Sequence, residues 1–188
     1  SLHDALPIYN DLLLSAINSA RTNIPNSQDI INREVNFYIS IDDKEGLKNS
    51  LYSALESDSN NPTLHFALGT ALQSLKDNEG AKNSYTQAIQ LNPNYFDAHN
   101  NLASMYLDET TSLITKMNNL GSSSSDQKKY NNYKKRRNNL YNESIPHLEK
   151  CVEIQPDNVM ILNVLKEIYY KVGDVKNMRR VKSLIESL

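Results

Sequence analysis

The sequence has little of what several protein classes depend on. Its single cysteine, Cys151, excludes an internal disulfide framework and any metal site made of several thiolates. No apolar run approaches the roughly 20 residues that cross a bilayer as a helix. The formal net charge of -2 gives no overall attraction to nucleic acid or acidic lipid. A basic binding surface would therefore have to be local.

An internal repeat of about 34 residues organises the sequence. The stretch "NNPTLHFALGTALQSLKDNEGAKNSYTQAIQLNPN" is followed by "NPNYFDAHNNLASMYLDE", where His65 and Leu68 recur as His99 and Leu102. Apolar residues recur at helical spacing on both sides of the polar turn "KDNEG", and "NPN" ends the pair because Pro does not continue a helix. One helix pair cannot bury its own apolar face, so neighbouring pairs are predicted to stack.

These positions resemble the tetratricopeptide repeat family. Its signature combines a large residue with Leu-Gly, then Ala and an aromatic residue, and a closing Pro. The resemblance implies an all-α fold, a right-handed superhelical stack of antiparallel helix pairs. His stands in place of the usual Trp and Leu in place of Tyr. The matching residues are His65-x2-Leu68-Gly69-x2-Leu72, Ala81-x3-Tyr85, Ala88 and Pro93.

The repeat register divides the chain into segments. A solenoid is predicted over residues 26–188, preceded by the second helix of a truncated repeat at residues 9–25. Residues 1–8, "SLHDALPI", lack the repeat pattern and resemble, letter for letter, one reading frame of a sequencing adapter. We therefore expect that they make no repeat-like packing contact and that a native partner helix is missing before Tyr9. The predicted repeats are residues 28–61, 62–95, 96–158 and 159–188.

The third repeat carries an insertion at about residues 108–142. Apolar residues at spacings of three and four flank the tip "GSSSS", which predicts two facing seams. We interpret the insertion as a projecting antiparallel helical hairpin about 20 Å long, with Ser125 or Asp126 as the N-cap of the return helix. This hairpin resembles those of bacterial envelope-associated repeat proteins. That resemblance implies periplasmic or envelope export as one location, and the sequence leaves the cytoplasm open as well.

Few residues have the types or spacing of a catalytic or metal site. No Gly-rich phosphate loop, carboxylate pair or Ser/His/Asp arrangement is recognisable. His65 and His99 share a repeat column, but their neighbours supply no further ligands, so we interpret both as packing residues. His147 is expected to face solvent or a neighbouring turn, and Cys151 to be a small buried residue rather than a nucleophile. We predict no enzyme, no cofactor and no metal.

The family resemblance also implies a peptide-binding groove along the first helices of successive repeats. Its columns are Asn-rich, mildly acidic and without Lys or Arg, which favours a neutral polar or weakly basic peptide. Chaperone-tail adaptors of the family hold a terminal carboxylate with Lys, Asn and Arg, and that clamp is absent here. The corresponding sites are Asn32, Asn36, Ala67, Asp97 and Asn101. The candidate groove residues are Asn32, Asn36, Phe66, Thr70, Gln73, Asn100, Ser104, Asn163, Glu167 and Tyr170.

One stretch, "KKYNNYKKRR", is strongly basic. Basic residues interleaved with aromatics can bind nucleic acid or anionic lipid. Tyr130 and Tyr133 fall in the predicted hairpin seam, which favours an ordinary solvated face and disfavours nucleic acid. The leading prediction is a non-catalytic scaffold that binds a protein or peptide through the groove or the hairpin; the alternative is a polyanion-binding module. The basic residues of this stretch are Lys128, Lys129, Lys134, Lys135, Arg136 and Arg137.

Overall fold

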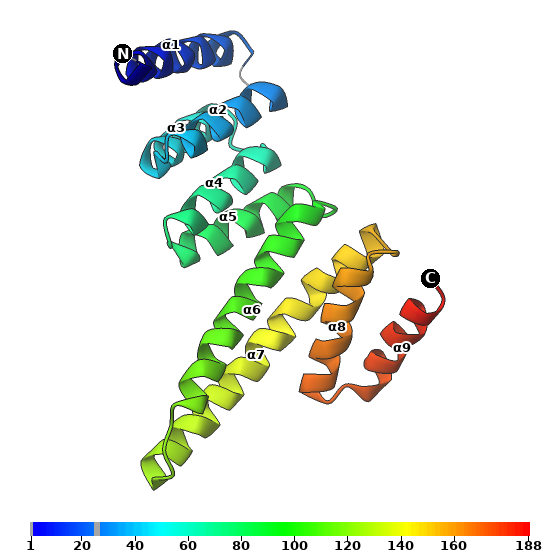
Figure 1. Ribbon diagram of the computed structural model, residues 1–188. Helices are drawn as coiled ribbons and strands as arrows, with labels where there is room; N and C mark the ends of the chain where they lie inside the picture. The colour runs from blue at the N-terminus through cyan, green and yellow to red at the C-terminus, as the bar shows by residue number, and fades with distance from the viewer. Residues whose placement is uncertain (1, 25–26) are drawn as a thin grey trace. The chain divides into compact units, whose positions relative to one another are not determined.

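The computed structural model describes residues 2–24 and 27–188, except for the side chains of residues 2–8, 28, 32, 35 and 57. Every regular element in these ranges is an α-helix (Figure 1), which confirms the all-α prediction. The helices divide into two compact units, one up to Pro93 and one from Asn94 onward. None of the described helices is both long and apolar enough to span a membrane.

The first unit holds one long helix and two helix pairs. Its helices are α1 (Leu2–Asn23), α2 (Gln28–Ser40), α3 (Lys44–Ser57), α4 (Pro62–Ser74) and α5 (Asn78–Leu91). Helix α1 begins at Leu2 rather than at Tyr9, so the predicted start of the helix was wrong, and Pro7 lies inside it. The side chains of "SLHDALPI" lie outside the described residues, and the expectation about their packing stays a prediction.

Aspartates cap the second helices of the pairs. Asp43 Oδ1 accepts a hydrogen bond from Gly46 N at 2.8 Å, and Asp77 Oδ1 accepts one from Gly80 N at 3.0 Å. A Cβ on either glycine would come within 2.2 or 2.6 Å of the capping carboxylate. The glycines therefore let each cap close over an otherwise unsatisfied N–H group.

Helices α4 and α5 approach closely around Tyr85. Its ring is fully buried, and a Cβ on Gly69 would lie 2.7 Å from it. Leu68, Ala81 and Ala88 complete this buried layer. The small residues at Gly69, Ala81 and Ala88 thus leave room for one large aromatic ring between the two helices.

The second unit contains the predicted projecting hairpin. Its helices are α6 (Phe96–Asn118), α7 (Ser124–Ile154), α8 (Val159–Val172) and α9 (Val175–Glu186). Helices α6 and α7 are 23 and 31 residues long, against 13 and 14 for α4 and α5, and their joined ends extend past α8 (Figure 1). This confirms the hairpin that the spacing of apolar residues predicted.

The return helix of the hairpin is capped by Ser123 rather than by Ser125 or Asp126. Ser123 has extended backbone angles, and its Oγ accepts a hydrogen bond from Asp126 N at 3.1 Å. Asp126 Oδ2 lies 2.7 Å from the same hydroxyl and accepts its proton. The predicted cap was wrong because Ser125 and Asp126 already lie in the first turn of α7, where Asp126 supplies the backbone N–H that Ser123 caps.

A single apolar core joins the helices of the second unit. Cys151, Leu162, Leu165 and Val181 are fully buried in it, and they come from α7, α8 and α9. Ala103 of α6 belongs to the same cluster. The base of the hairpin is therefore part of this core, whereas its far end packs only as a helix pair.

Candidate functional site

Helix α8 presents four large or polar side chains on one exposed face. Met160, Asn163, Glu167 and Tyr170 follow one another at spacings of three and four residues, which places them on one side of the helix. Met160 is 72% exposed and Tyr170 is 70% exposed. The opposite side of α8 forms the core, so this face is available to a partner. We call these four residues the α8 face.

Two lysines flank the α8 face and moderate its charge. Lys166 Nζ donates to Asn163 Oδ1 at 2.8 Å. Lys171 Nζ lies 3.7 Å from Glu167 Oε1, in an exposed pair one helical turn apart. The face therefore combines an aromatic ring, a thioether, an amide and a partly neutralised carboxylate.

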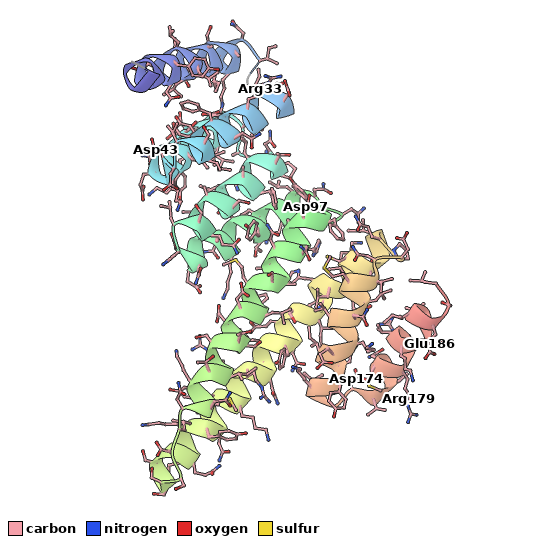
Figure 2. All side chains as sticks on the ribbon, viewed as in Figure 1. Arg33, Asp43, Asp97, Asp174, Arg179 and Glu186 are labelled. Carbon is pink, nitrogen blue, oxygen red and sulfur yellow. The ribbon has the colours of Figure 1, made fainter. Side chains whose placement is uncertain are left out.

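Helix α6 contributes the other predicted groove residues of the second unit. Ser104 is exposed and Asn100 is half-buried. Ala103, the neighbour of Ser104, shares the apolar core with Leu162 of α8. Asp97 lies exposed in the first turn of α6 (Figure 2), where a carboxylate is favoured by the helix dipole.

In the first unit, three predicted groove residues surround one buried tyrosine. The hydroxyl of Tyr85 lies 2.8 Å from Gln73 Oε1 and 3.3 Å from Thr70 Oγ1. The Phe66 ring lies 5.6 Å from the Tyr85 ring, between centroids. The Tyr85 hydroxyl thus helps to fix the positions of the Thr70 and Gln73 side chains on α4. Asn36 on α2 is exposed, while the side chain of Asn32 lies outside the described residues.

A histidine pair lies at the base of the hairpin, and sequence reasoning missed it. The Nδ1 atoms of His99 and His147 are 3.0 Å apart, and the ring of Tyr106 stacks on His147 with 6.2 Å between centroids. The expectation that His147 faces solvent or a neighbouring turn was wrong, since this side chain is half-buried against His99 of helix α6. Its position seven residues after the buried Leu140 was the signal that it belongs to the seam.

The histidines differ in environment. Burial, and then the nearby His99, lower the pKa of His147 to about 4, so this ring is neutral at pH 7. His65 is also half-buried, but its partner is backbone: Nε2 lies 2.8 Å from the carbonyl oxygen of Ser59. Within residues 2–24 and 27–188, no three His, Cys, Asp or Glu side chains gather as they would around a metal ion.

Cys151 is buried in the core of the second unit, as predicted. Its Sγ lies 3.8 Å from the carbonyl oxygen of Phe96. Burial first, and then the charge of Asp97, raise the pKa of the Cys151 thiol to about 11. The thiol is therefore protonated at neutral pH and is not an activated nucleophile.

A polar cleft of about 770 Å³ lies among α1, α2 and α3. Its floor is Glu34, a buried carboxylate that accepts hydrogen bonds from Arg21 and Ser50. Burial, and then the charge of Glu34, raise the pKa of Tyr38 beside it. Because the ion pair balances its own charges, the cleft offers a ligand mainly hydroxyl and amide groups. Sequence reasoning did not bring these residues together.

The basic stretch lies on α7 in the projecting hairpin. Lys129 and Arg136 lie 3.9 and 3.6 Å from Asp126 and Glu109, while Arg137 is half-buried over the Tyr141 ring. The prediction that both tyrosines point inward was wrong for Tyr130, which is 39% exposed; Tyr133 is half-buried. The hairpin is only two helices thick here, which leaves Tyr130 at its edge. The exposed cations are Lys128, Lys129, Lys134, Lys135 and Arg136.

Comparisons with known proteins agree with this architecture. Residues 72–108 match the family model described as TPR repeat, and residues 136–158 match that of the tetratricopeptide repeat. These matches confirm the predicted repeat type. No curated protein sequence matches the chain significantly.

Several solved structures share the fold. A crystal structure of MamA protein has a TM-score of 0.62 at 16% identity, covering 97% of this chain and 84% of that one. A Bacteroides ovatus protein described as protein binding has a TM-score of 0.53 at 17% identity, covering 97% and 90%. The human IFIT1 dimer with m7Gppp-AAAA has a TM-score of 0.59 at 14% identity, covering 94% and 36%. At these identities the likeness establishes the fold.

Proposed function

We propose that this tetratricopeptide repeat protein is a non-catalytic scaffold that binds a peptide segment of another protein along the first helices of its repeats. The observation that carries the proposal is the α8 face, where Met160 and Tyr170 expose large side chains on a helix whose other side forms the core. Stacked repeats present such faces in succession, and this gives extended binding surfaces.

The chemistry of these faces favours a neutral polar or weakly basic peptide. Tyr170 and Met160 supply apolar contact area, and Asn163 and Glu167 supply hydrogen-bonding groups. In the first unit, Asn36 and Thr70 are exposed polar side chains on α2 and α4. A weakly basic segment suits Glu167, whose carboxylate is only loosely paired.

The most reactive residue types support a non-catalytic role. The Cys151 thiol is held protonated by burial, and the low pKa of His147 leaves that imidazole neutral and turned toward His99. A general base or nucleophile needs access to a substrate, and both side chains face the interior of the second unit.

The alternative, binding of nucleic acid or an anionic membrane by the basic stretch, has weaker support. Binding to single strands uses successive aromatic platforms, and membrane insertion uses exposed apolar side chains. Among the described residues of the hairpin, Tyr130 is the one large hydrophobic side chain that is well exposed.

Selection of peptides from a random library on the purified chain tests the proposal. We expect Tyr170→Ala to weaken the binding of selected peptides by at least about tenfold, which corresponds to about 1.4 kcal/mol of binding free energy. The matched control is Tyr52→Ala, which removes an exposed tyrosine from a second helix, α3. Peptides whose affinity is unchanged by Tyr170→Ala, Met160→Ala and Thr70→Ala would show that the first helices are not the binding surface.

A further inference from the structure

The hairpin carries a cationic surface that the groove does not use. Residues 127–142 of α7, which we call the basic arm, contain no acidic residue. Lys128, Lys134 and Lys135 are exposed, and within the described part of the chain they form no ion pair. The chain as a whole has a net charge of -2, so positive charge is concentrated locally on this arm.

The outer face of the basic arm has a regular pattern. Lys128, Asn132, Lys135, Asn139 and Asn142 follow at spacings of four and three residues, and all five are exposed. Such spacing places them in one row along the helix. Lys128 and Lys135 are separated by seven residues, or about 10.5 Å along the axis. The row therefore offers two cations two turns apart, with amides between and beyond them.

The opposite side of the arm is occupied by the hairpin itself. Leu140 and Tyr141 of α7 are buried in this seam, and Leu113 and Met117 of α6 are buried as well. Figure 1 shows this end of the hairpin extending past α8 in the second unit. The outer row can thus meet a partner without any rearrangement of the seam.

The pattern favours a helix over other anionic partners. Two cations one heptad apart on a straight helix match carboxylates one heptad apart on a facing helix. The asparagines can donate to and accept from the side chains of such a helix. The arm has no row of aromatic platforms for nucleic acid and few apolar side chains to insert into a membrane. Among the described residues of the hairpin, Tyr130 is the one large hydrophobic side chain that is well exposed.

We propose that the outer face of the basic arm docks an acidic helical segment of a partner protein, with carboxylates spaced by seven residues against Lys128 and Lys135. This inference rests on the proposed scaffold function and assigns a second partner surface to it, separate from the first-helix faces. The surface is polar throughout, so binding is electrostatic and weakens as salt screens it.

The test uses the purified full chain and defined probes. A fluorescent helical peptide with glutamates at heptad spacing is compared with an isomer of equal composition whose glutamates are spread around the helix. Oligothymidylate and phosphatidylcholine vesicles with about 30% phosphatidylserine are the other probes. Binding is measured by anisotropy, or by co-sedimentation for vesicles, at about 50 mM and about 300 mM NaCl.

A matched pair of variants isolates the surface. Lys128→Gln with Lys135→Gln removes the two cations of the row, and Lys176→Gln with Lys182→Gln removes two exposed cations from α9. We expect the heptad peptide to bind at least about fivefold tighter than its isomer, and the arm variant to lose that binding by about fivefold or more. The α9 variant should stay within about twofold of the parent.

Three results would overturn the inference. They are equal binding of the two peptides, equal loss in the arm and α9 variants, or a preference for oligothymidylate or vesicles. Peptides selected through Tyr170 are measured on the arm variant in parallel. If these peptides bind the parent chain normally while the heptad peptide does not bind it, the arm proposal falls and the scaffold stands. If they are insensitive to the first-helix variants, the proposed groove falls instead.

Discussion

The Nδ1 atoms of His99 on α6 and His147 on α7 face each other at 3.0 Å, although the two residues are 48 positions apart in the chain. A neutral imidazole carries one N–H, so one ring donates and the other accepts. A further proton on the accepting nitrogen would remove this bond and place a charge in a largely desolvated site. The contact therefore ties the base of the hairpin to the protonation state of His147.

The first prediction concerns the pH dependence of stability. The pKa of His147 is lowered to about 4 by burial and then by His99, against about 6.5 in the unfolded chain. The folded state binds fewer protons between these values, so this contribution is complete above pH 6.5 and is lost as pH falls toward 4. We expect a loss on the order of 3 kcal/mol in the free energy of unfolding, measured by urea denaturation.

Two variants separate this effect from general acid unfolding. His147→Asn should lack this decrease in the free energy of unfolding between pH 6.5 and 4, whereas His65→Gln should keep it. Identical slopes in the parent chain and His147→Asn would contradict the assignment.

The second prediction concerns the buried ion pair of α1 and α2. The side chains of Arg21 and Glu34 are 14% and 3% exposed, and Arg21→Ala would leave a buried carboxylate without its cation. We expect a cost of about 3 kcal/mol and loss of hydrogen-exchange protection in α1. Arg33→Ala is the control, because Arg33 (Figure 2) and Asp29 are 71% and 76% exposed, and it should cost less than about 1 kcal/mol. Equal losses of stability in Arg21→Ala and Arg33→Ala would show that the buried ion pair with Glu34 does not stabilise the packing of α1.

The third prediction concerns the approach of α4 to α5. Gly69→Ala should destabilise the first unit, since its Cβ would lie 2.7 Å from the Tyr85 ring. Overpacking costs about 1–3 kcal/mol and outweighs the gain of about 1 kcal/mol in helix propensity. Thermal unfolding measures the effect. In a Tyr85→Leu background the same change should become neutral or stabilising, and a cost that persists there would rule out the ring as its cause.

The fourth prediction concerns the thiol of Cys151. Burial raises its pKa to about 11, so almost no thiolate exists at pH 8 in the folded chain. Alkylation should be at least about 100-fold slower in the native protein than in urea, where the pKa returns to about 8.5. Mass spectrometry of iodoacetamide-treated protein gives both rates. Fast native labelling would mean that the core around Cys151 opens readily.

Much of the architecture follows from local pattern. The repeat of apolar residues predicted an all-α tetratricopeptide protein, and the seam spacing predicted the hairpin of α6 and α7 (Figure 1). Residues at spacings of three and four share a helix face in any helix, so no knowledge of the packed structure was needed. The same reasoning correctly predicted that Cys151 is buried.

Errors arose where the outcome depends on details of a helix end or on how deeply a face is covered. Ser123 caps α7 because its hydroxyl reaches Asp126 N, a choice among four successive serines that composition does not distinguish. Tyr130 lies in the seam by its spacing, yet it is 39% exposed because only one helix packs against α7 there.

The sequence by itself determined the helix type, the repeat period and the positions of the turns, because these depend on residues within one or two turns of each other. Tertiary packing decided the contacts of His99 with His147 and of Arg21 with Glu34, and the exposure of the α8 face. Each depends on how separate helices rotate and approach to bury their apolar faces. Polar side chains carried along with those faces meet partners that no local spacing specifies.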